Sequence, residues 1–269
     1  MSDPAPAVSM LRPAKRVALP QAPRVFDKQD VVPAPSALKE RLEQLRARYD
    51  GVHATTLLEA AIFDEFPGQI ATVSSFGSES VVLLHLISQI DPTVPVIFLN
   101  TGKLFGETLR YRDRLQAKLG LTDLRSIGPH PDDEKALDPD GTLWSRDPDA
   151  CCNFRKVLPL RRALSGFQAE ITGRKRFQTV ARAVMGPVEL NGTRFVINPL
   201  HGWSLADLVA HIEKYDLPRH PLVADGFLSI GCMPCTQRVK AGDDYRSGRW
   251  AGSDKDECGI HENVEGDGI

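Results

Sequence analysis

Five cysteines carry the clearest chemical signal in this 269-residue sequence. Four of them form two tight pairs, Cys151-Cys152 and Cys232-Met-Pro-Cys235, while Cys258 stands alone near the C-terminus. A secreted disulfide framework is normally short, cysteine-dense and even in count, and adjacent cysteines rarely bond to each other. The pairs therefore indicate metal or redox chemistry in a reducing compartment.

Two close pairs can supply four thiolates to one site. Zinc is the most common metal at such sites. Adjacent cysteines crowd two thiolates around a single ion, whereas an iron–sulfur cube distributes its ligands over separate iron atoms and accommodates the pair more easily. A reversible dithiol is the third option, and the cysteine spacing by itself leaves all three open.

Cys258 belongs to neither pair and is a candidate nucleophile. The thiolate is the attacking form, so the site needs positive charge that lowers the pKa of the thiol. Residues 254–257 are mostly acidic, and the positive charge must come from elsewhere, for instance from Arg246, Arg249 or the basic segment described below. His261 is placed to hydrogen-bond near the thiolate. The alternatives are a spare surface cysteine and an ordinary surface histidine.

Two polar loops are placed to bind an anion. Residues 74–80 (Ser-Ser-Phe-Gly-Ser-Glu-Ser) lie between a predicted strand and a predicted helix. Small residues there let backbone N–H groups approach an anion, and the helix N-terminus adds positive potential. Asn100-Thr-Gly102 follows the next predicted strand. Because ligands bind at the carboxyl ends of the strands of an open parallel sheet, the two loops predict a nucleotide pocket. Ordinary Ser/Gly turns are the alternative.

A basic segment follows another β-prone run. Thr172-Gly-Arg-Lys-Arg176 is trailed by Gln178 and Arg182, and arginine forks bind phosphate or sulfate oxygens in pairs. The chain carries 33 Lys and Arg against 35 Asp and Glu, a formal net charge of −2, so a local basic cluster stands out. A solvated basic loop is the alternative.

The elements that must position these residues alternate between strand and helix. Apolar strands separated by amphipathic helices predict an α/β fold with an open, mostly parallel sheet and helices on both faces. Asn191-Gly192 predicts a type I′ hairpin near a sheet edge, and Ser36 and Ser204 predict helix N-caps, the latter in a capping box with Asp207. The predicted strands cover 69–73, 94–99, 122–127, 169–172, 188–190 and 194–197, and the predicted helices cover 36–49, 55–63, 81–87, 108–119 and 204–215.

Composition narrows the class of protein. The chain is 42% hydrophobic and 25% charged, which is typical of soluble globular proteins. Its near-neutral charge argues against a general nucleic-acid or membrane-surface binder. No apolar run approaches the roughly 18 residues of a membrane span, and no secretion signal is visible, so we expect a cytoplasmic protein. Residues 1–36 predict a disordered Pro/Ala-rich leader, 37–240 the nucleotide-binding domain, and 241–269 a mobile tail that carries Cys258.

Taken together, residues 55–262 resemble the assimilatory sulfonucleotide reductases, and specifically the adenylyl-sulfate (APS) reductases that carry an iron–sulfur cluster. The resemblance rests on the two cysteine pairs followed by Glu257-Cys-Gly-Ile-His261. It implies an adenine nucleotide alpha hydrolase-like (PP-loop) fold. It also implies that one 4Fe–4S cluster is held by Cys151, Cys152, Cys232 and Cys235.

The resemblance further implies the reaction and its partners. Cys258, with His261 beside it, attacks the sulfur of adenylyl sulfate, releases AMP and becomes an S-sulfocysteine. Thioredoxin or glutaredoxin then liberates sulfite, a step of sulfate assimilation toward cysteine. Whether the chain forms a homo-oligomer is left open. The substrate-binding residues that the resemblance implies are Ser74, Ser75, Phe76, Gly77, Ser78, Asn100, Thr101, Gly102, Lys156, Arg174, Arg176, Gln178, Arg182, Arg246 and Arg249.

Three alternatives accompany this interpretation. The 3′-phosphoadenylyl-sulfate (PAPS) reductases typically lack the two cysteine pairs, although cluster-bearing members can accept both substrates. An ATP-dependent tRNA-thiolating enzyme would need a pyrophosphate loop that residues 74–80 do not match. A zinc-stabilised nucleotide-binding regulatory module would leave Cys258 without a role. Asn100 and Thr179 also depart from the family, where Asp and Ser are frequent.

Overall fold

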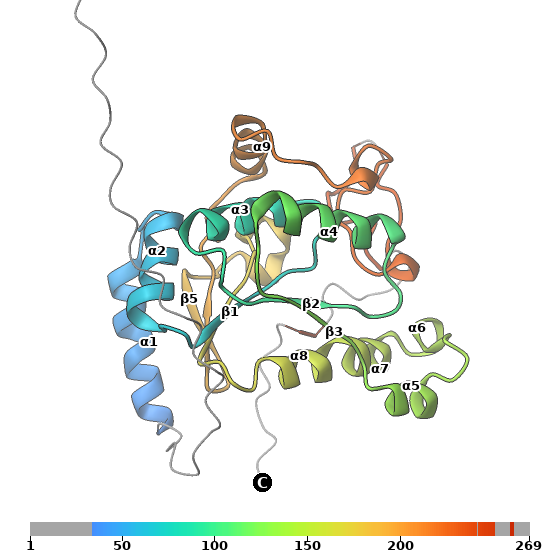
Figure 1. The fold of residues 1–269 in the computed structure, drawn as a ribbon, viewed down its shortest axis with the longest axis horizontal. Helices are drawn as coiled ribbons and strands as arrows, with labels where there is room; N and C mark the ends of the chain where they lie inside the picture. Colours follow the sequence, from blue (N-terminus) through green and yellow to red (C-terminus); the bar gives the residue numbers. More distant parts are fainter. Residues whose placement is uncertain (1–33, 241, 251–258, 261–269) are drawn as a thin grey trace, which may run out of the picture. The chain divides into compact units, whose positions relative to one another are not determined.

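A six-stranded sheet forms the centre of the computed structural model, which describes residues 34–240, 242–250 and 259–260 (Figure 1). The strand order is β3-β2-β1-β4-β6-β5, and each neighbouring pair is parallel except β5–β6. The predicted α/β fold with an open, mostly parallel sheet is therefore confirmed. The strands are β1 (Ile70–Val73), β2 (Val96–Leu99), β3 (Leu124–Ile127), β4 (Ala169–Ile171), β5 (Val188–Asn191) and β6 (Arg194–Ile197).

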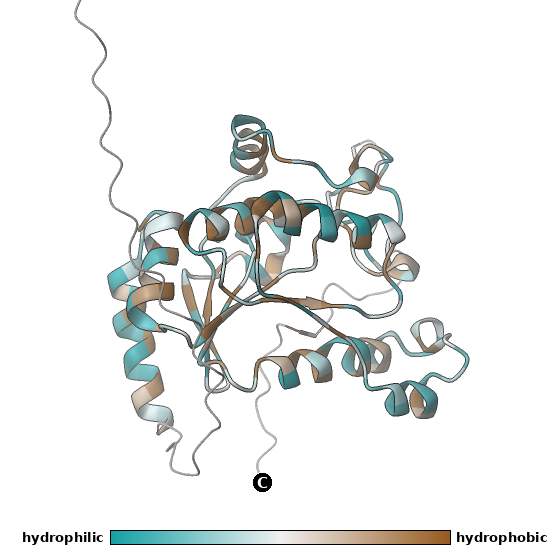
Figure 2. Ribbon diagram, viewed as in Figure 1, coloured by the Kyte–Doolittle hydropathy of each residue, from teal (hydrophilic) through white to brown (hydrophobic). Residues whose placement is uncertain are grey.

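Helices cover both faces of the sheet, and the alternation of side chains along each strand explains why. Val96 and Phe98 of β2 belong to the large core with helices α3 (Ser80–Ile90) and α4 (Gly106–Leu119). Ile97, between them, faces the other way into a smaller core with Leu160 of α8 (Leu158–Ala163). Figure 1 shows α3 and α4 on one side of the sheet and α8 on the other. The central strand β2 is accordingly hydrophobic along its length, whereas α1 and α4 carry hydrophilic residues on part of their surface (Figure 2).

The first helices largely follow the sequence prediction. Helix α1 (Pro35–Tyr49) buries Leu38, Leu42, Leu45 and Tyr49, the predicted apolar stripe. Its start differs, because the helix begins at Pro35 and Ser36 lies inside the first turn rather than at the N-cap. Proline suits a first helical position, since its missing N–H would have no helical partner there. Helix α2 (Ala54–Ala60) passes directly into a π-helical turn, Ala61–Glu65.

The predicted hairpin forms at the sheet edge, but its turn differs from the prediction. Asn191 pairs with Arg194, so Gly192 and Thr193 are the central residues of the loop. Gly192 has a φ of 59°, and neither Asn191 nor Thr193 has a positive φ. A type I′ turn needs positive φ at both central residues, so this turn is of another type. Glycine is required at only one of its positions.

The chain between β3 and β4, where the sequence analysis placed no helix, contains several short helices. Helix α8 packs against β2 and β3, and α7 (Pro148–Cys152), which carries the first cysteine pair, lies on the same side of the sheet as α8 (Figure 1). Later in the chain, Ser204 and Asp207 form the predicted capping box at the start of α9. The elements are α5 (Pro131–Leu137), α6 (Leu143–Arg146), α7 (Pro148–Cys152), a π-helical turn (Asn153–Val157), α9 (Leu205–Lys214) and 3₁₀ turns at Arg176–Gln178, Val180–Arg182, Pro221–Val223 and Met233–Cys235.

The two predictions on the chain termini stay predictions. The leader, residues 1–36, and the tail, residues 241–269, fall mostly outside the described residues, as do Cys258 and His261. Among the helices of the described part, none combines the length and apolar character that crossing a membrane requires.

Candidate functional site

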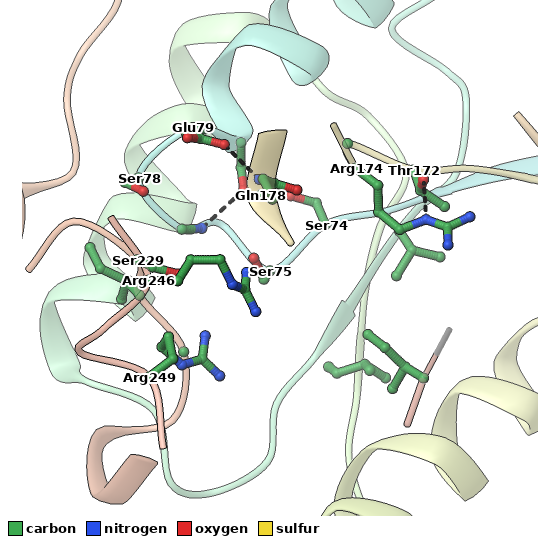
Figure 3. A pocket seen from close by; sticks show the side chains of 18 of the residues that line it. Ser74, Ser75, Ser78, Glu79, Thr172, Arg174, Gln178, Ser229, Arg246 and Arg249 are labelled. Atoms are coloured by element: carbon green, nitrogen blue, oxygen red, sulfur yellow. Dashed lines mark hydrogen bonds between the residues drawn. The ribbon is translucent and has the colours of Figure 1, made fainter. Parts of the chain in front are cut away.

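Loops at the carboxyl ends of β1, β2 and β4 enclose a cavity of about 220 Å³ (Figure 3). This is the edge at which open parallel sheets bind their ligands. The loop after β1 contributes Ser74 and Ser75, the loop after β2 contributes Thr101, and the basic segment after β4 contributes Arg174. The predicted site residues that line the cavity are Ser74, Ser75, Gly77, Ser78, Thr101, Lys156, Arg174, Gln178, Arg182, Arg246 and Arg249.

The loop after β1 is shaped by one residue in the left-handed region. Phe76 has a φ of 51°, and its ring is fully buried in edge contact with Phe98, with 5.4 Å between ring centroids. Its N–H donates to Ser74 Oγ at 3.2 Å, and the N–H of Gly77 donates to Ser80 Oγ at 3.0 Å. Phe76 therefore anchors the loop in the core and does not line the cavity. A side chain at position 77 would come within 3.1 Å of the Ile230 carbonyl, which explains the glycine.

Several other predicted residues also lie outside the cavity lining. Asn100 accepts from the N–H of Gly102 at 3.2 Å, which closes a turn after β2. Arg176 donates through Nε to the Met185 carbonyl at 2.7 Å. These side chains shape the loops that carry the lining residues.

The basic segment is held by specific partners. Arg174 donates to Glu189 Oε2 at 2.7 Å and to Asn198 Oδ1 at 3.2 Å, so its guanidinium is tied to β5 and the end of β6. Arg182 donates to Gln178 Oε1 at 2.5 Å. Acidic and amide side chains thus orient this segment before any ligand arrives.

The cavity is strongly cationic. Of the described residues that line it, six are Lys or Arg and one, Glu79, is a carboxylate. Arg246 and Arg249 point into the space that Ser75 borders (Figure 3). The apolar part of the lining includes Val73, Leu83 and Leu99. A cavity with apolar walls and many cations suits a ligand with a flat base and a multiply charged anionic group.

All four paired cysteines line a second, smaller cavity. None of the four forms a disulfide bond, and Cys151, Cys152 and Cys232 are buried. Burial, followed by the neighbouring Cys152 charge, raises the pKa of Cys151 to about 11, and burial and Cys232 raise the pKa of Cys235. The structure therefore brings together the pairs that are far apart in sequence. Within the described ranges, no three His, Cys, Asp or Glu side chains are close enough to form a group for a single metal ion.

Four sulfur atoms that could act as metal or cluster ligands therefore line one small cavity. Thr101 Oγ1 lies 3.2 Å from Cys232 Sγ, and Lys156 Nζ lies 3.7 Å from Cys152 Sγ, so polar groups already surround the sulfurs.

Lys156 links the two cavities because it lines both. The neighbouring residue, Arg155, is 1% exposed. Arg155 donates to the Thr101 carbonyl at 2.8 Å and to Asp138 Oδ2 at 2.7 Å. These bonds fix the cysteine-bearing helix against the loop after β2.

The family is decided by comparison with known proteins. The family model of the phosphoadenosine phosphosulfate reductase domain matches residues 69–238, which is more than half of the chain. The chain belongs to this family. An adenosine 5′-phosphosulfate reductase of a Chelativorans species is 49% identical over 232 residues, which cover 84% of this chain and 94% of the relative. One of Mesorhizobium japonicum is 50% identical over 217 residues, 81% of this chain and 85% of the relative.

A solved structure agrees with this family assignment. The crystal structure of the PAPS reductase of Candida auris, in a phosphate complex, has a TM-score of 0.64 and 25% sequence identity. It covers 75% of this chain and 97% of the fungal chain. The fold described above is therefore that of the phosphosulfate reductase family.

In this reductase fold, the described part of the tail reaches the cavity. Ile260 lines the cavity and packs on the smaller core beside Leu99 and Ile127. Cys258 itself and His261 lie outside the described residues.

Some lining residues were not predicted from the sequence. Glu79 and Lys175 lie inside segments that the sequence did single out, and Lys175 stands directly between two predicted arginines. Tyr245 and Trp250 come from a segment without periodicity, where no local pattern marks a pocket residue. Ser229, Ile230 and Gly231 likewise reach the cavity only because the chain before Cys232 folds back against the loop after β1.

Proposed function

We propose that this reductase converts adenylyl sulfate to sulfite and AMP through a sulfonated cysteine at position 258. The observation that carries the proposal is the adjacency of two sites: a cationic nucleotide-sized cavity and a four-cysteine cavity, joined by Lys156 and bordered by Ile260. The relatives named adenosine 5′-phosphosulfate reductases support it.

In the first step, the thiolate of Cys258 attacks the sulfur of adenylyl sulfate. The new S–S bond forms as the bond from sulfur to the bridging oxygen breaks, and that oxygen leaves with AMP. The sequence around Cys258 is mostly acidic, so the positive charge that favours the thiolate comes from the cavity. Lys156, Arg246 and Arg249 are the cations that would stabilise the charge on the phosphosulfate during this attack.

In the second step, a protein dithiol such as that of thioredoxin or glutaredoxin attacks Cys258 Sγ. Sulfite leaves with the electron pair of the S–S bond, and the second thiol of the partner resolves the mixed disulfide, which restores Cys258 and leaves the partner oxidised. Phe177, Val180 and Val184 are 40%, 94% and 91% exposed on the segment that carries Gln178 and Arg182. Exposed apolar residues beside the cavity support docking of a protein partner there.

The four paired cysteines would hold a 4Fe–4S cluster, which would cross-link segments that are distant in sequence. Lys156 is positioned between those sulfurs and the nucleotide cavity. Two-electron reduction is complete with the dithiol, so no electron needs to come from the cluster. The reducing thiol chemistry fits the cytoplasm.

The decisive experiment measures sulfite release from adenylyl sulfate and from its 3′-phosphorylated form in parallel, with thioredoxin or glutaredoxin present. We expect release from adenylyl sulfate, loss of that release in Cys258→Ser, and retention of iron and acid-labile sulfide in the same variant. Sulfite formation by Cys258→Ser would refute the mechanism. Stoichiometric zinc without sulfide would refute the cluster, and faster release from the 3′-phosphorylated substrate would refute the substrate assignment.

A further inference from the structure

Three of the four paired cysteines are closed off from solvent. Cys151, Cys152 and Cys232 are between 5% and 8% exposed, whereas Cys235 is half-buried. A metal ion or cluster that binds all four sulfurs, or leaves them, must therefore pass the residues around them. Part of the wall of the cysteine cavity has to move, and the packing of each wall segment indicates which part moves most easily.

Most of this wall is firmly packed. The first cysteine pair lies on α7, and the π-helical turn after it buries Phe154, Arg155 and Lys156. The second pair is bonded to the loop after β2, because the Lys103 carbonyl accepts from the Met233 N–H at 2.7 Å. Moving either segment would break backbone hydrogen bonds or expose buried side chains, at a high cost in free energy.

Residues 131–146, which we call the flap, are packed differently. The flap contains α5 and α6 and lies beyond α7, at the end of the molecule away from β5 (Figure 1). Both helices lie wholly within the described ranges and neither buries a residue; Leu137 of α5 is 51% exposed. The buried residue of the flap is Asp138, which is polar. Trp144 of the flap nevertheless lines the cysteine cavity, so the flap forms part of its wall without an apolar core of its own.

Polar contacts tie the flap to the rest of the described chain. Arg155 donates to Glu134 Oε1 and to Asp138 Oδ2, both at 2.7 Å. Lys103 Nζ donates to the Gly141 carbonyl at 2.8 Å. Opening of the flap would expose both partners of each contact to water, so neither charge would be left buried without its partner. A segment held in this way opens more readily than one held by buried apolar area.

We propose that the flap opens locally, while the rest of the protein stays folded, and is the path by which metal reaches and leaves the four cysteines. This inference rests on the assignment of these cysteines as metal ligands in the proposed function. The cysteine-bearing helix keeps its own start when the flap moves, because Asp147 Oδ1 caps α7 by accepting from the Ala150 N–H at 2.9 Å. The ligands of the first pair therefore stay in place during the opening.

The test follows two rates in the holoprotein: release of metal to excess EDTA, and amide hydrogen exchange of the flap. Glu134→Ala removes a contact whose carboxylate is 47% exposed and does not line the cysteine cavity. We expect both rates to rise together by about fivefold, because one charge-assisted hydrogen bond of the closed flap is lost. Unchanged rates, or faster exchange of the flap without faster release of metal, would overturn the proposal.

Arg146→Ala is the matched control. Arg146 pairs with Asp140 at 2.7 Å, both side chains are about half exposed, and both residues belong to the flap. Loss of this pair does not untie the flap from the rest of the protein, so metal release should keep the wild-type rate. Amides of α4, which lies across the sheet, should keep their exchange rates in both variants. Equal acceleration in Arg146→Ala, or acceleration in α4, would indicate a general loss of stability and would count against the proposal.

Failure of the proposed function gives a separate result. The metal and the acid-labile sulfide are measured in the same samples, so zinc without sulfide would refute the cluster, while the rates of zinc release would still test the flap. If Glu134→Ala does not fold, Glu134→Gln takes its place, because it removes the charge and keeps an oxygen that can accept. A smaller acceleration of both rates is then expected, and no acceleration would overturn the proposal.

Discussion

Replacing Arg155 with Met should destabilise the protein far more than replacing any exposed arginine. The Arg155 side chain is 2% exposed and pairs with Asp138, whose side chain is fully buried, at 2.7 Å. Burial by itself raises the pKa of Asp138, but the hydrogen bonds from Arg155 and from the Leu143 N–H outweigh it, and the pKa lies below its ordinary value of 3.8. Without Arg155, a buried carboxylate would lose its compensating charge.

The expected magnitude follows from this burial. Removing one partner of a buried ion pair typically costs about 3–5 kcal/mol, because the other charge remains buried and uncompensated. At roughly 2–4 °C per kcal/mol for a chain of this size, the melting temperature should fall by roughly 6–20 °C. The Arg146–Asp140 pair has a similar 2.7 Å contact but is about half exposed on both sides. Arg146→Met should therefore cost about 0–1 kcal/mol.

Denaturant unfolding of the holoprotein, followed by circular dichroism, measures these differences. The double variant Arg155→Met/Asp138→Leu should recover a large part of the loss, because it removes the stranded charge as well. If the double variant is no more stable than the single one, the loss comes from the other contacts of Arg155, those with Glu134 and the Thr101 carbonyl, and the charge argument is wrong. In the wild type, the contribution of Asp138 should persist above its ordinary pKa and disappear as the pH falls through its lower folded-state pKa.

Three further predictions test other parts of the molecule. Burial lowers the pKa of His220 from 6.5 to about 4. The fold is therefore fully stable above pH 6.5 with respect to this group, and about 3 kcal/mol should be lost as the pH falls from 6.5 to 4. The unfolding free energy of His220→Gln should depend less on pH in this range, and an unchanged pH dependence would contradict the assignment. Cys232→Ser should lower iron content and solubility together, since the ligands come from distant segments, and a fully active, iron-free variant would contradict this. Cleavage after Lys255 in limited proteolysis should slow when AMP is bound, because we expect the tail to close over the nucleotide; equal rates with and without AMP would indicate a fixed tail.

Local sequence patterns determined the framework of this protein. The apolar strands, the stripe from Leu38 to Tyr49 on α1, the capping box at Ser204 and the polar loops after β1 and β2 all depend on residues that are neighbours in sequence or one helical turn apart. Such patterns can be recognised without knowing the fold, since burial of a strand or of one helix face requires a definite spacing of apolar residues. The two cysteine pairs are informative for a similar reason: residues that are adjacent or three apart in sequence stay close together whatever fold the chain adopts.

Tertiary structure decided which of these residues face the ligand. Phe76, in the middle of a loop of serines, turns into the core because its left-handed backbone directs the ring onto Phe98. Arg174 is held by Glu189, a residue of the edge strand whose position depends on the order of all six strands. Glu79 meets Lys175 only because β1 and β4 are neighbours in the sheet. Contacts between distant segments follow from strand order and packing, and no spacing within one segment encodes them.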